Sequence, residues 1–240
     1  MNYKLQVKNI SDIITKIFRY NLKIIFANKF IYFLLAAVGI FLLVTVINLL
    51  DADANPTEGT IYYLLLVPGI LIIFYPTTFG IQNDVDTRMI EILFGIPNYR
   101  YKVWLVRIAL IYVVVFVILL ILSLLSSVAL VAVPIFKMVF QLMFPIFFLG
   151  CLAFMISTLV RNGNGTAVFI IIIGMTFWIL SEPLATSQWN LFLNPFSVPS
   201  NVNEAVWMET SLNNRTYLLI GTVIAILFGL LNLQKREKFV

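Results

Sequence analysis

The chain has 240 residues, of which 61% are hydrophobic and only 11% charged. A soluble surface needs roughly a quarter of its residues charged, so this composition excludes a soluble domain and places the chain in a lipid bilayer. The net charge of +5 comes with no histidine and one cysteine, which excludes His-dependent catalysis, the usual His or Cys metal sites and an internal disulfide.

Residues 1–29 predict an amphipathic helix that lies in the membrane interface. Four isoleucines recur at helical spacing and three basic residues occupy more polar positions: Ile10, Ile13, Ile14, Ile17, Lys16, Arg19 and Lys23. Such a helix lies with its basic side chains toward anionic headgroups. It is either a plain membrane anchor or a helix that also contacts a cytoplasmic partner.

Six uncharged stretches are long enough to cross about 30 Å of hydrocarbon as helices, which takes about 20 residues each. We expect these spans at 31–50, 61–81, 108–136, 139–160, 162–181 and 216–233. The expected fold is therefore an all-α integral membrane protein with six transmembrane helices in one domain, residues 1–240. An even number of spans puts both termini on the same side.

The basic residues predict which side that is. Fourteen of the 16 Lys and Arg residues fall on the side of the termini, and only Lys137 and Arg215 fall on the other. Because basic residues are enriched in cytoplasmic loops, we expect a multi-pass protein of the cell membrane with both termini in the cytoplasm. The net charge then reflects topology, and no nucleic acid is expected as a partner.

The polar segment 83–104, between the second and third spans, predicts a cytoplasmic coupling element. Asp84, Asp86 and Thr87 are typical helix-start residues, the run from Arg88 to Phe94 is amphipathic, and the stretch from Gly95 to Pro97 ends it. The apolar residues of this short helix have no bilayer to enter at that point. We therefore expect another protein to contact it.

No catalytic arrangement is found along the chain. Helix capping explains Asp84 and Asp86 better than acid–base chemistry, and the only cysteine, Cys151, is expected to be a small buried residue in the fourth span. There is no GxxxxGK[ST] phosphate loop, and the Asn-Gly-Asn-Gly run at 162–165 has no lysine. We expect no enzyme activity and no catalytic, cofactor or metal site in this chain.

The expected spans contain no Asp, Glu, Lys or Arg, which argues against a proton- or ion-coupled carrier. Polar residues within otherwise apolar spans are candidates to line a path for an amphipathic substrate, and these are Thr45, Asn48, Thr77 and Thr176. The alternative is that small and hydroxylated residues serve helix packing.

The expected outer loop, residues 182–215, contains too many aromatic and proline residues for a freely solvated linker. We expect it to lie on or dip into the outer leaflet. Four of its residues are candidates for an outer gate: Trp189, Phe192, Pro195 and Phe196. The alternative is an interfacial aromatic belt with no gating role.

The order of these parts resembles the permease subunit of type-2 ABC exporters over nearly the whole chain. The most specific part is Glu91, Ile92 and Leu93, followed by Pro97 and Arg100, which is similar to the family's acidic helix with a proline and a basic residue before the third span. The resemblance implies a coupling helix at 86–97 that docks on an ATPase subunit through Asp86, Arg88, Met89, Glu91, Ile92, Leu93 and Pro97.

The same resemblance implies the structure of the outer loop and the partner subunits of the transporter. The outer loop would form short re-entrant helices around Asn194-Pro195-Phe196 that close the outer end of the path. Two permease chains, as a homodimer or with a sister permease, would work with ABC ATPase subunits that hold ATP and Mg, with no cofactor in this chain. Membrane lipid is a further expected partner.

The expected function is export of a hydrophobic or amphipathic substrate. The first expectation is a peptide toxin or antimicrobial peptide, as in the phenol-soluble modulin exporters. A lipid or a hydrophobic drug is the alternative substrate, and a non-transporting membrane anchor or sensor is an alternative of a different class.

Overall fold

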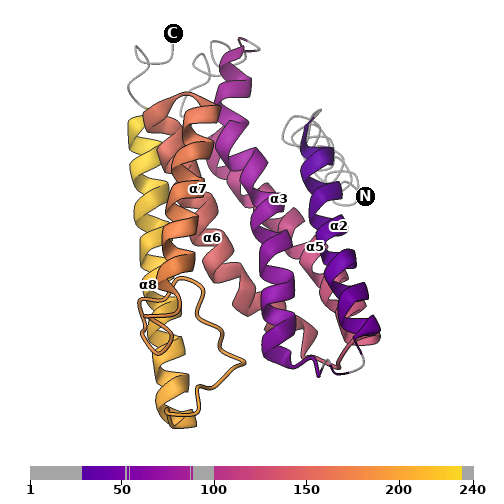
Figure 1. Ribbon diagram of the computed structural model, residues 1–240. Coiled ribbons are helices and arrows are strands. Elements are labelled where there is room, and N and C mark those ends of the chain that lie inside the picture. Colours follow the sequence, from indigo (N-terminus) through magenta and orange to yellow (C-terminus); the bar gives the residue numbers. More distant parts are fainter. Residues whose placement is uncertain (1–28, 52, 54, 87, 89–99, 234–240) are drawn as a thin grey trace, which may run out of the picture.

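In the computed structural model, residues 29–51, 53, 55–86, 88 and 100–233 are described, and this part of the chain is helical without strands. Six helices are long and apolar enough to cross a membrane (Figure 1). They are α2 (Phe30–Leu50), α3 (Glu58–Asp86), α5 (Val106–Ala129), α6 (Ile135–Val160), α7 (Gly163–Leu180) and α8 (Glu204–Asn232), with a short π-helix, η1 (Arg100–Leu105), before α5. The expected all-α membrane fold is confirmed.

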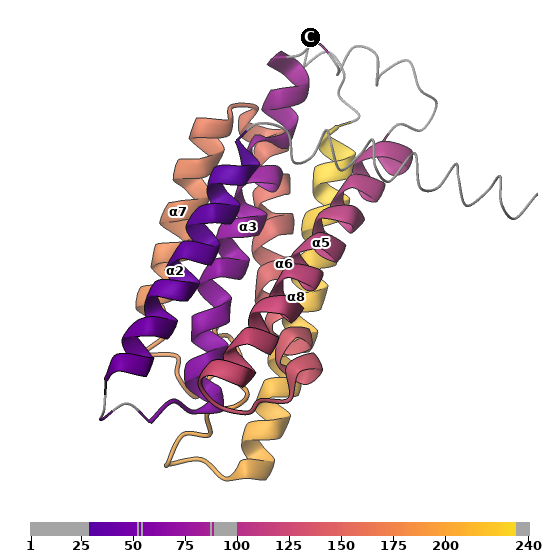
Figure 2. The same ribbon diagram turned by 90° about the vertical axis from the view of Figure 1, so that its right-hand side faces the viewer.

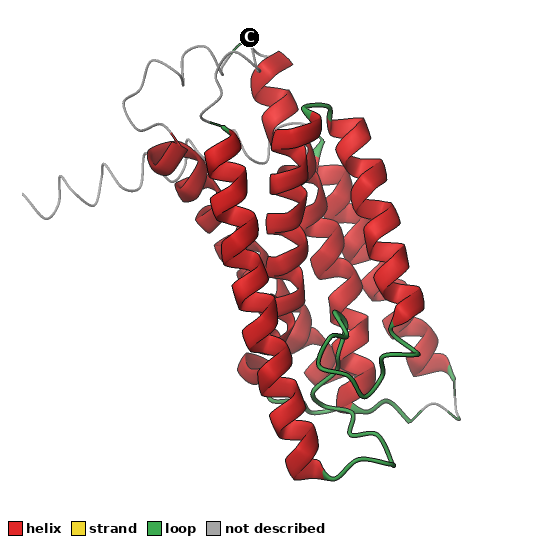
Figure 3. Cartoon of the chain, turned by 90° about the vertical axis from the view of Figure 1, so that its left-hand side faces the viewer, coloured by secondary structure: helices red, strands yellow, loops and turns green. Residues whose placement is uncertain are grey.

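Successive helices run in opposite directions along the bundle (Figures 1 and 2). The start of α2, the end of α3, the α6–α7 turn and the end of α8 gather at one end, which we call the inner end because the basic residues predict it to be cytoplasmic. The connections α2–α3, α5–α6 and α7–α8 gather at the outer end (Figure 3). This arrangement agrees with six crossings, and α2 begins at the same end of the bundle at which α8 ends.

The third and fourth spans differ from their expected bounds. The uncharged stretch 108–136 predicts one long helix, but α5 ends at Ala129 and α6 already begins at Ile135. The break lies at Pro134, which precedes α6 and has no backbone N–H to continue a helix. Because the residues between the helices are all uncharged, hydropathy alone does not reveal this turn.

The last helix is longer than expected. We expected a span at 216–233 and an outer loop reaching residue 215, but α8 already begins at Glu204, where the Asn203 side chain accepts a hydrogen bond from the Ala205 N–H. At 1.5 Å per residue, a helix of 29 residues is about 44 Å long. Since the hydrocarbon is only about 30 Å thick, α8 extends past it. The outer loop is therefore residues 181–203.

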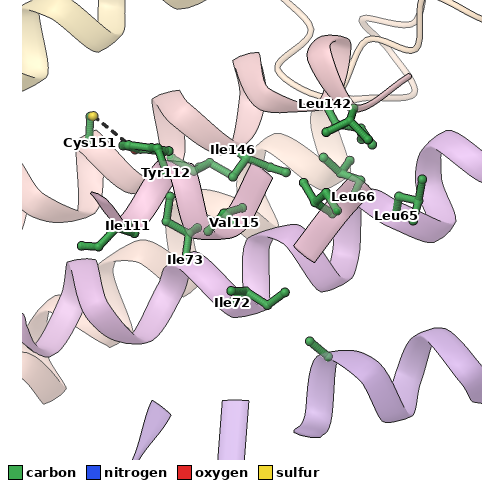
Figure 4. Packing of buried hydrophobic residues seen from close by; sticks show 14 of the residues in the cluster. Leu65, Leu66, Ile72, Ile73, Ile111, Tyr112, Val115, Leu142, Ile146 and Cys151 are labelled. Carbon is green, nitrogen blue, oxygen red and sulfur yellow. Dashed lines mark hydrogen bonds between the residues drawn. The ribbon is translucent and has the colours of Figure 1, made fainter. Parts of the chain in front are cut away.

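The centre of the bundle is formed by α3 and α6, the most buried of the six helices. α3 contacts α2, α5, α6 and α7, and α6 contacts α3, α5, α7 and α8. In the core (Figure 4), side chains of α3 lie against those of α5 and α6: Leu65, Leu66, Ile72, Ile73, Ile111, Tyr112, Val115, Leu142 and Ile146. Close packing of this kind drives helix association in a bilayer, where water gives no hydrophobic force between helices.

Gly150 allows α6 to approach α3 closely. A Cβ atom at this position would lie 2.5 Å from Cδ1 of Ile73 and 2.6 Å from the Tyr112 hydroxyl. That hydroxyl cannot easily move away, because it donates a 2.7 Å hydrogen bond to the Phe147 carbonyl and also contacts the Cys151 sulfur at 3.2 Å. Cys151 is buried here, as the sequence predicts.

The bundle predicts opposite accessibility of Ser197 and Asn164. Both residues are exposed, but Ser197 lies in the outer loop and Asn164 lies at the inner start of α7. In a Cys151→Ala background, we expect a cysteine at Ser197 to react with a membrane-impermeant thiol reagent in intact cells. A cysteine at Asn164 should react only after the cells are opened. The reverse pattern would invert the expected orientation.

Candidate functional site

A cavity of about 500 Å³ lies among four of the helices and the outer loop. It is lined by Phe33 of α2; Val67, Ile70, Leu71, Ile73, Phe74 and Thr77 of α3; Leu149, Gly150 and Ala153 of α6; Ile170, Ile171, Gly174, Met175 and Trp178 of α7; and Phe192 of the loop. The hydrogen of the Thr77 hydroxyl is already donated within α3, to the Ile73 carbonyl at 2.7 Å. The lining therefore offers apolar contact and no charge.

The cavity is bounded at its outer end and open along α7. The Trp178 and Phe192 rings meet edge to face, with centroids 5.6 Å apart, where α7 leads into the outer loop. Two lining residues of α7, Ile171 and Met175, are 50% and 60% exposed. These exposed side chains put the opening of the cavity on the outward-facing surface of α7.

The four polar residues proposed to line a path are not brought together. Thr77 lines the cavity, but Thr45 and Asn48 lie on α2 and donate to the carbonyls four residues earlier in that helix. Thr176 is exposed on α7 and makes the same kind of bond, to the Ile172 carbonyl. All four side chains thus donate a hydrogen bond within their own helix, as the packing alternative predicts.

The outer-gate residues have different positions in the loop. Phe192 is buried at the cavity, and the partly buried Phe196 has its ring 6.1 Å from that of Tyr62 on α3. Trp189 is exposed and stacks on Tyr217 of α8 at 4.5 Å. Pro195 is partly buried. Only Phe192 therefore bounds the cavity directly.

The expected re-entrant helices are not formed, since residues 181–203, all described, consist of turns, bends and irregular backbone. The side-chain oxygens of Asn190 and Asn194 each accept a hydrogen bond from the backbone N–H two residues later, at Phe192 and Phe196. Such asparagine turns compete with helical hydrogen bonding. Pro195 also removes one of the N–H groups that a helix would need.

Sequence reasoning missed the residue that organises the outer end. Arg215, expected at the end of the outer loop, is 6% exposed inside the bundle. Its guanidinium donates to the Gln141 amide oxygen at 2.8 Å, the Asn214 amide oxygen at 2.8 Å, the Leu193 carbonyl at 3.1 Å and the Tyr62 hydroxyl at 3.2 Å. The sequence does contain a signal for this position of Arg215. The polar stretch 203–216 can also be read as an amphipathic extension of the last helix.

A second charged group is buried at the inner end. Nη1 of Arg107, in the first turn of α5, lies 2.8 Å from Oδ2 of Asp84, in the last turn of α3, and both side chains are 5% exposed. The Arg107 guanidinium also lies 4.6 Å from the centre of the Trp104 ring. Among the described residues this is the only ion pair, and it joins the two helices that flank the predicted coupling segment.

The C-terminal end of α3 corrects the expected start of the coupling helix. Asp84 and Asp86 were predicted to start that helix, but both belong to the last turns of α3. Arg88 follows in a left-handed conformation, with φ at 54°, and its N–H bonds to the Val85 carbonyl, which ends α3. The other expected contact residues, Met89, Glu91, Ile92, Leu93 and Pro97, lie outside the described residues.

The Asn-Gly-Asn-Gly run is the start of α7. The Asn162 side chain accepts hydrogen bonds from the N–H groups of Asn164 and Gly165, as an N-cap does. The Gly163 N–H donates to the amide oxygen of Gln82 on α3. These bonds fasten α7 to α3 at the inner end and give the run a structural role.

Within the described part of the chain, no group of three or more His, Cys, Asp and Glu residues could hold a metal ion. Comparisons with protein-family models, curated proteins and solved structures found no match for this chain. A functional assignment therefore depends on the residues and geometry described above.

The ion pair predicts that neutralising Asp84 lowers the stability of the protein much more than neutralising the neighbouring Asp86. Asp84→Asn leaves the Arg107 cation buried without its partner, which should lower the free energy of unfolding by about 3–5 kcal/mol. Asp86→Asn is the matched control, because Asp86 is exposed, and should change it by less than about 0.5 kcal/mol. Denaturant unfolding in detergent micelles measures both. Equal effects of the two variants would mean that the pair does not stabilise the α3–α5 junction.

Proposed function

We propose that the chain is the permease subunit of a type-2 ABC exporter in the cell membrane. It moves a hydrophobic or amphipathic substrate out of the cell, and a peptide is the first candidate. The single observation that carries the proposal is the uncharged cavity of about 500 Å³ inside a six-helix membrane bundle, bounded by an ordered loop at its outer end.

The chemistry of the cavity supports this substrate class. Burial of apolar surface is worth about 25 cal/mol per Å², so an acyl chain or an apolar peptide side chain gains free energy on entering. Ions and sugars would lose hydration and gain no polar partner. The helices do contain charged residues beyond the expected spans, but Asp84, Arg107 and Arg215 lie outside the cavity lining and bond to other protein groups.

The inner end supports coupling to a separate ATPase. The positive-inside bias favours a cytoplasmic position for the segment between Arg88 and Arg100, as for both termini. Since the Asp84–Arg107 pair joins the helices on either side of this segment, a force applied there acts on α3 and α5 together. ATP and Mg belong to the partner subunit. Two permease chains alternate between inward- and outward-open states. Nucleotide bound to the ATPase subunits and substrate bound to the permease shift the balance between these states, according to how tightly each ligand binds in each state.

One observation favours a lipid or hydrophobic drug as the second candidate substrate. The cavity is open along Ile171 and Met175 of α7, and its volume is within the range of about 300–1,000 Å³ typical of small-ligand sites. A whole peptide helix does not fit into it, so a peptide would place a few apolar side chains there. Lipid from the bilayer enters by the same opening.

The coupling part of the proposal predicts that an ATPase subunit with a phosphate loop co-purifies with the tagged permease from its native membrane. Glu91→Lys and Leu93→Ala should leave the permease in the membrane and abolish stimulation of ATP turnover, because they remove a charged and an apolar contact. Val128→Ala, a truncation at an exposed outer position, should keep normal turnover. Normal stimulation in both coupling variants would remove the segment from the mechanism.

Substitution of two helix glycines that have open space beside them tests whether the cavity binds the substrate. A Cβ at Gly174 or at Gly39 meets no atom within 4 Å, but only Gly174 lines the cavity. Gly174→Phe fills the cavity and should raise the concentration of an amphipathic peptide needed for half-maximal ATPase stimulation about tenfold or more, whereas Gly39→Phe should not. Stimulation by metal ions or sugars alone would contradict both the peptide and the lipid version.

A further inference from the structure

Arg215 connects four of the elements that meet at the outer end of the bundle. Its hydrogen-bond partners belong to α3, α6, the outer loop and α8: Tyr62, Gln141, Leu193 and Asn214. The loop partner, the Leu193 carbonyl, is next to Phe192, which bounds the cavity at its outer end. A molecule that leaves the cavity outward must displace Phe192, and the neighbouring backbone is held by the guanidinium.

Asparagine side chains strengthen the same attachment. The Asn214 amide donates to the backbone carbonyls of Gln188 and Asn190 in the loop, both at 2.8 Å. The Asn194 amide donates to the Gly59 carbonyl in the first turn of α3 at 2.9 Å. The loop is therefore held to α3 and α8 by polar bonds, and the Arg215 and Asn214 side chains bind its middle part.

The partners of Arg215 differ in kind from those of Arg107 at the inner end. Separation of Asp84 from Arg107 would break an ion pair between two buried opposite charges, which is strongly unfavourable. The four Arg215 acceptors are neutral, and within the described part of the chain no carboxylate forms an ion pair with it. When the outer end opens, water can solvate both the guanidinium and these acceptors. The outer contact can therefore be released at a lower cost than the inner one.

We propose that Arg215 is a releasable latch. It positions the Phe192–Leu193 stretch over the outer end of the cavity, and its release opens the outer end during transport. This inference deepens the proposed export function and rests on it. It assigns the closed state of the outer loop to one buried cation, and it predicts that the loop, not the bundle, responds when that cation is removed.

A reporter cysteine measures the latch without any transport assay. Leu193 is 1% exposed, so a cysteine there, in a Cys151→Ala background, should react slowly with an impermeant thiol reagent. Arg215→Gln should speed this labelling about tenfold or more, because labelling follows the population of the open loop. Tyr62→Phe, which removes one partner and keeps the cation, should give a smaller increase.

A second reporter separates loop opening from unfolding. Ser126 on α5 is fully buried and is replaced by cysteine with little change of shape. In Arg215→Gln it should stay protected while the reporter at Leu193 reacts. Fast reaction at both positions would overturn the proposal, because Arg215 would then hold the whole bundle together. Unchanged protection of Leu193 in Arg215→Gln would overturn it as well.

A reversible crosslink tests whether release is part of the cycle. A Cβ at Gly59 would lie 3.1 Å from the Ser197 Cβ, within a few tenths of an ångström of the spacing of about 3.5–4.5 Å in a disulfide. Gly59→Cys with Ser197→Cys, in the same background, should lock the loop to α3. We expect oxidation to abolish peptide-stimulated ATP turnover and dithiothreitol to restore it. Gly59→Cys alone should not respond to oxidation.

The two hypotheses fail in different ways. If the oxidised pair turns over ATP as fast as the reduced pair in a complex that still responds to Glu91→Lys, the latch is wrong and the export function stands. If no ATPase co-purifies, the export function fails. The labelling of Leu193 still decides in that case whether Arg215 holds the loop.

Discussion

The absence of water in the hydrocarbon layer is the constraint on which the whole structure depends. Every backbone N–H and carbonyl must find a partner inside the segment, so the chain crosses as helices. Hydroxyl groups follow the same rule, since Thr45, Thr77 and Thr176 all donate to a carbonyl of their own helix. Charged side chains near the layer must be paired within the protein, and this decides where the two buried arginines lie.

The two ends of the bundle satisfy this constraint in different ways. At the inner end, Arg107 has a carboxylate partner from the neighbouring helix and is fixed with it. At the outer end, Arg215 is surrounded by neutral oxygen atoms from four elements. A charge pair resists separation in a medium of low dielectric constant, and a set of neutral hydrogen bonds can be exchanged for water. The chain thus combines an inner junction held by an ion pair with an outer junction held by neutral hydrogen bonds.

Packing around α3 and α6 leaves room for the cavity. At Gly150 the two central helices and Tyr112 meet so closely that a methyl group does not fit, whereas Gly174 of α7 has open space beside it. The same small residue therefore serves close contact at one position and a void at another. The resulting space is apolar because α3, α6 and α7 present almost only aliphatic and aromatic side chains toward it, which suits substrates drawn from the bilayer.

The sequence by itself determined the class of the protein, the number of crossings and the approximate position of each, because uncharged length is the dominant requirement of the membrane. It did not reveal the turn before Pro134, since all residues there are uncharged, or the helical start of α8 at Glu204, since its charged residues were read as loop. For the candidate site, composition predicted an apolar path, and one of four proposed lining residues, Thr77, reaches the cavity.

Only the tertiary structure decided which partners the polar residues have. Asp84 meets Arg107 across 23 positions of sequence, and Arg215 meets Tyr62 across 153. Neither of these contacts between residues far apart in the sequence can be predicted from its periodicity. Periodicity shows which face of a helix is apolar, but not which other helix packs against that face. The bilayer fixed which segments are helical, and the need to satisfy buried charges fixed how those helices are joined at their ends.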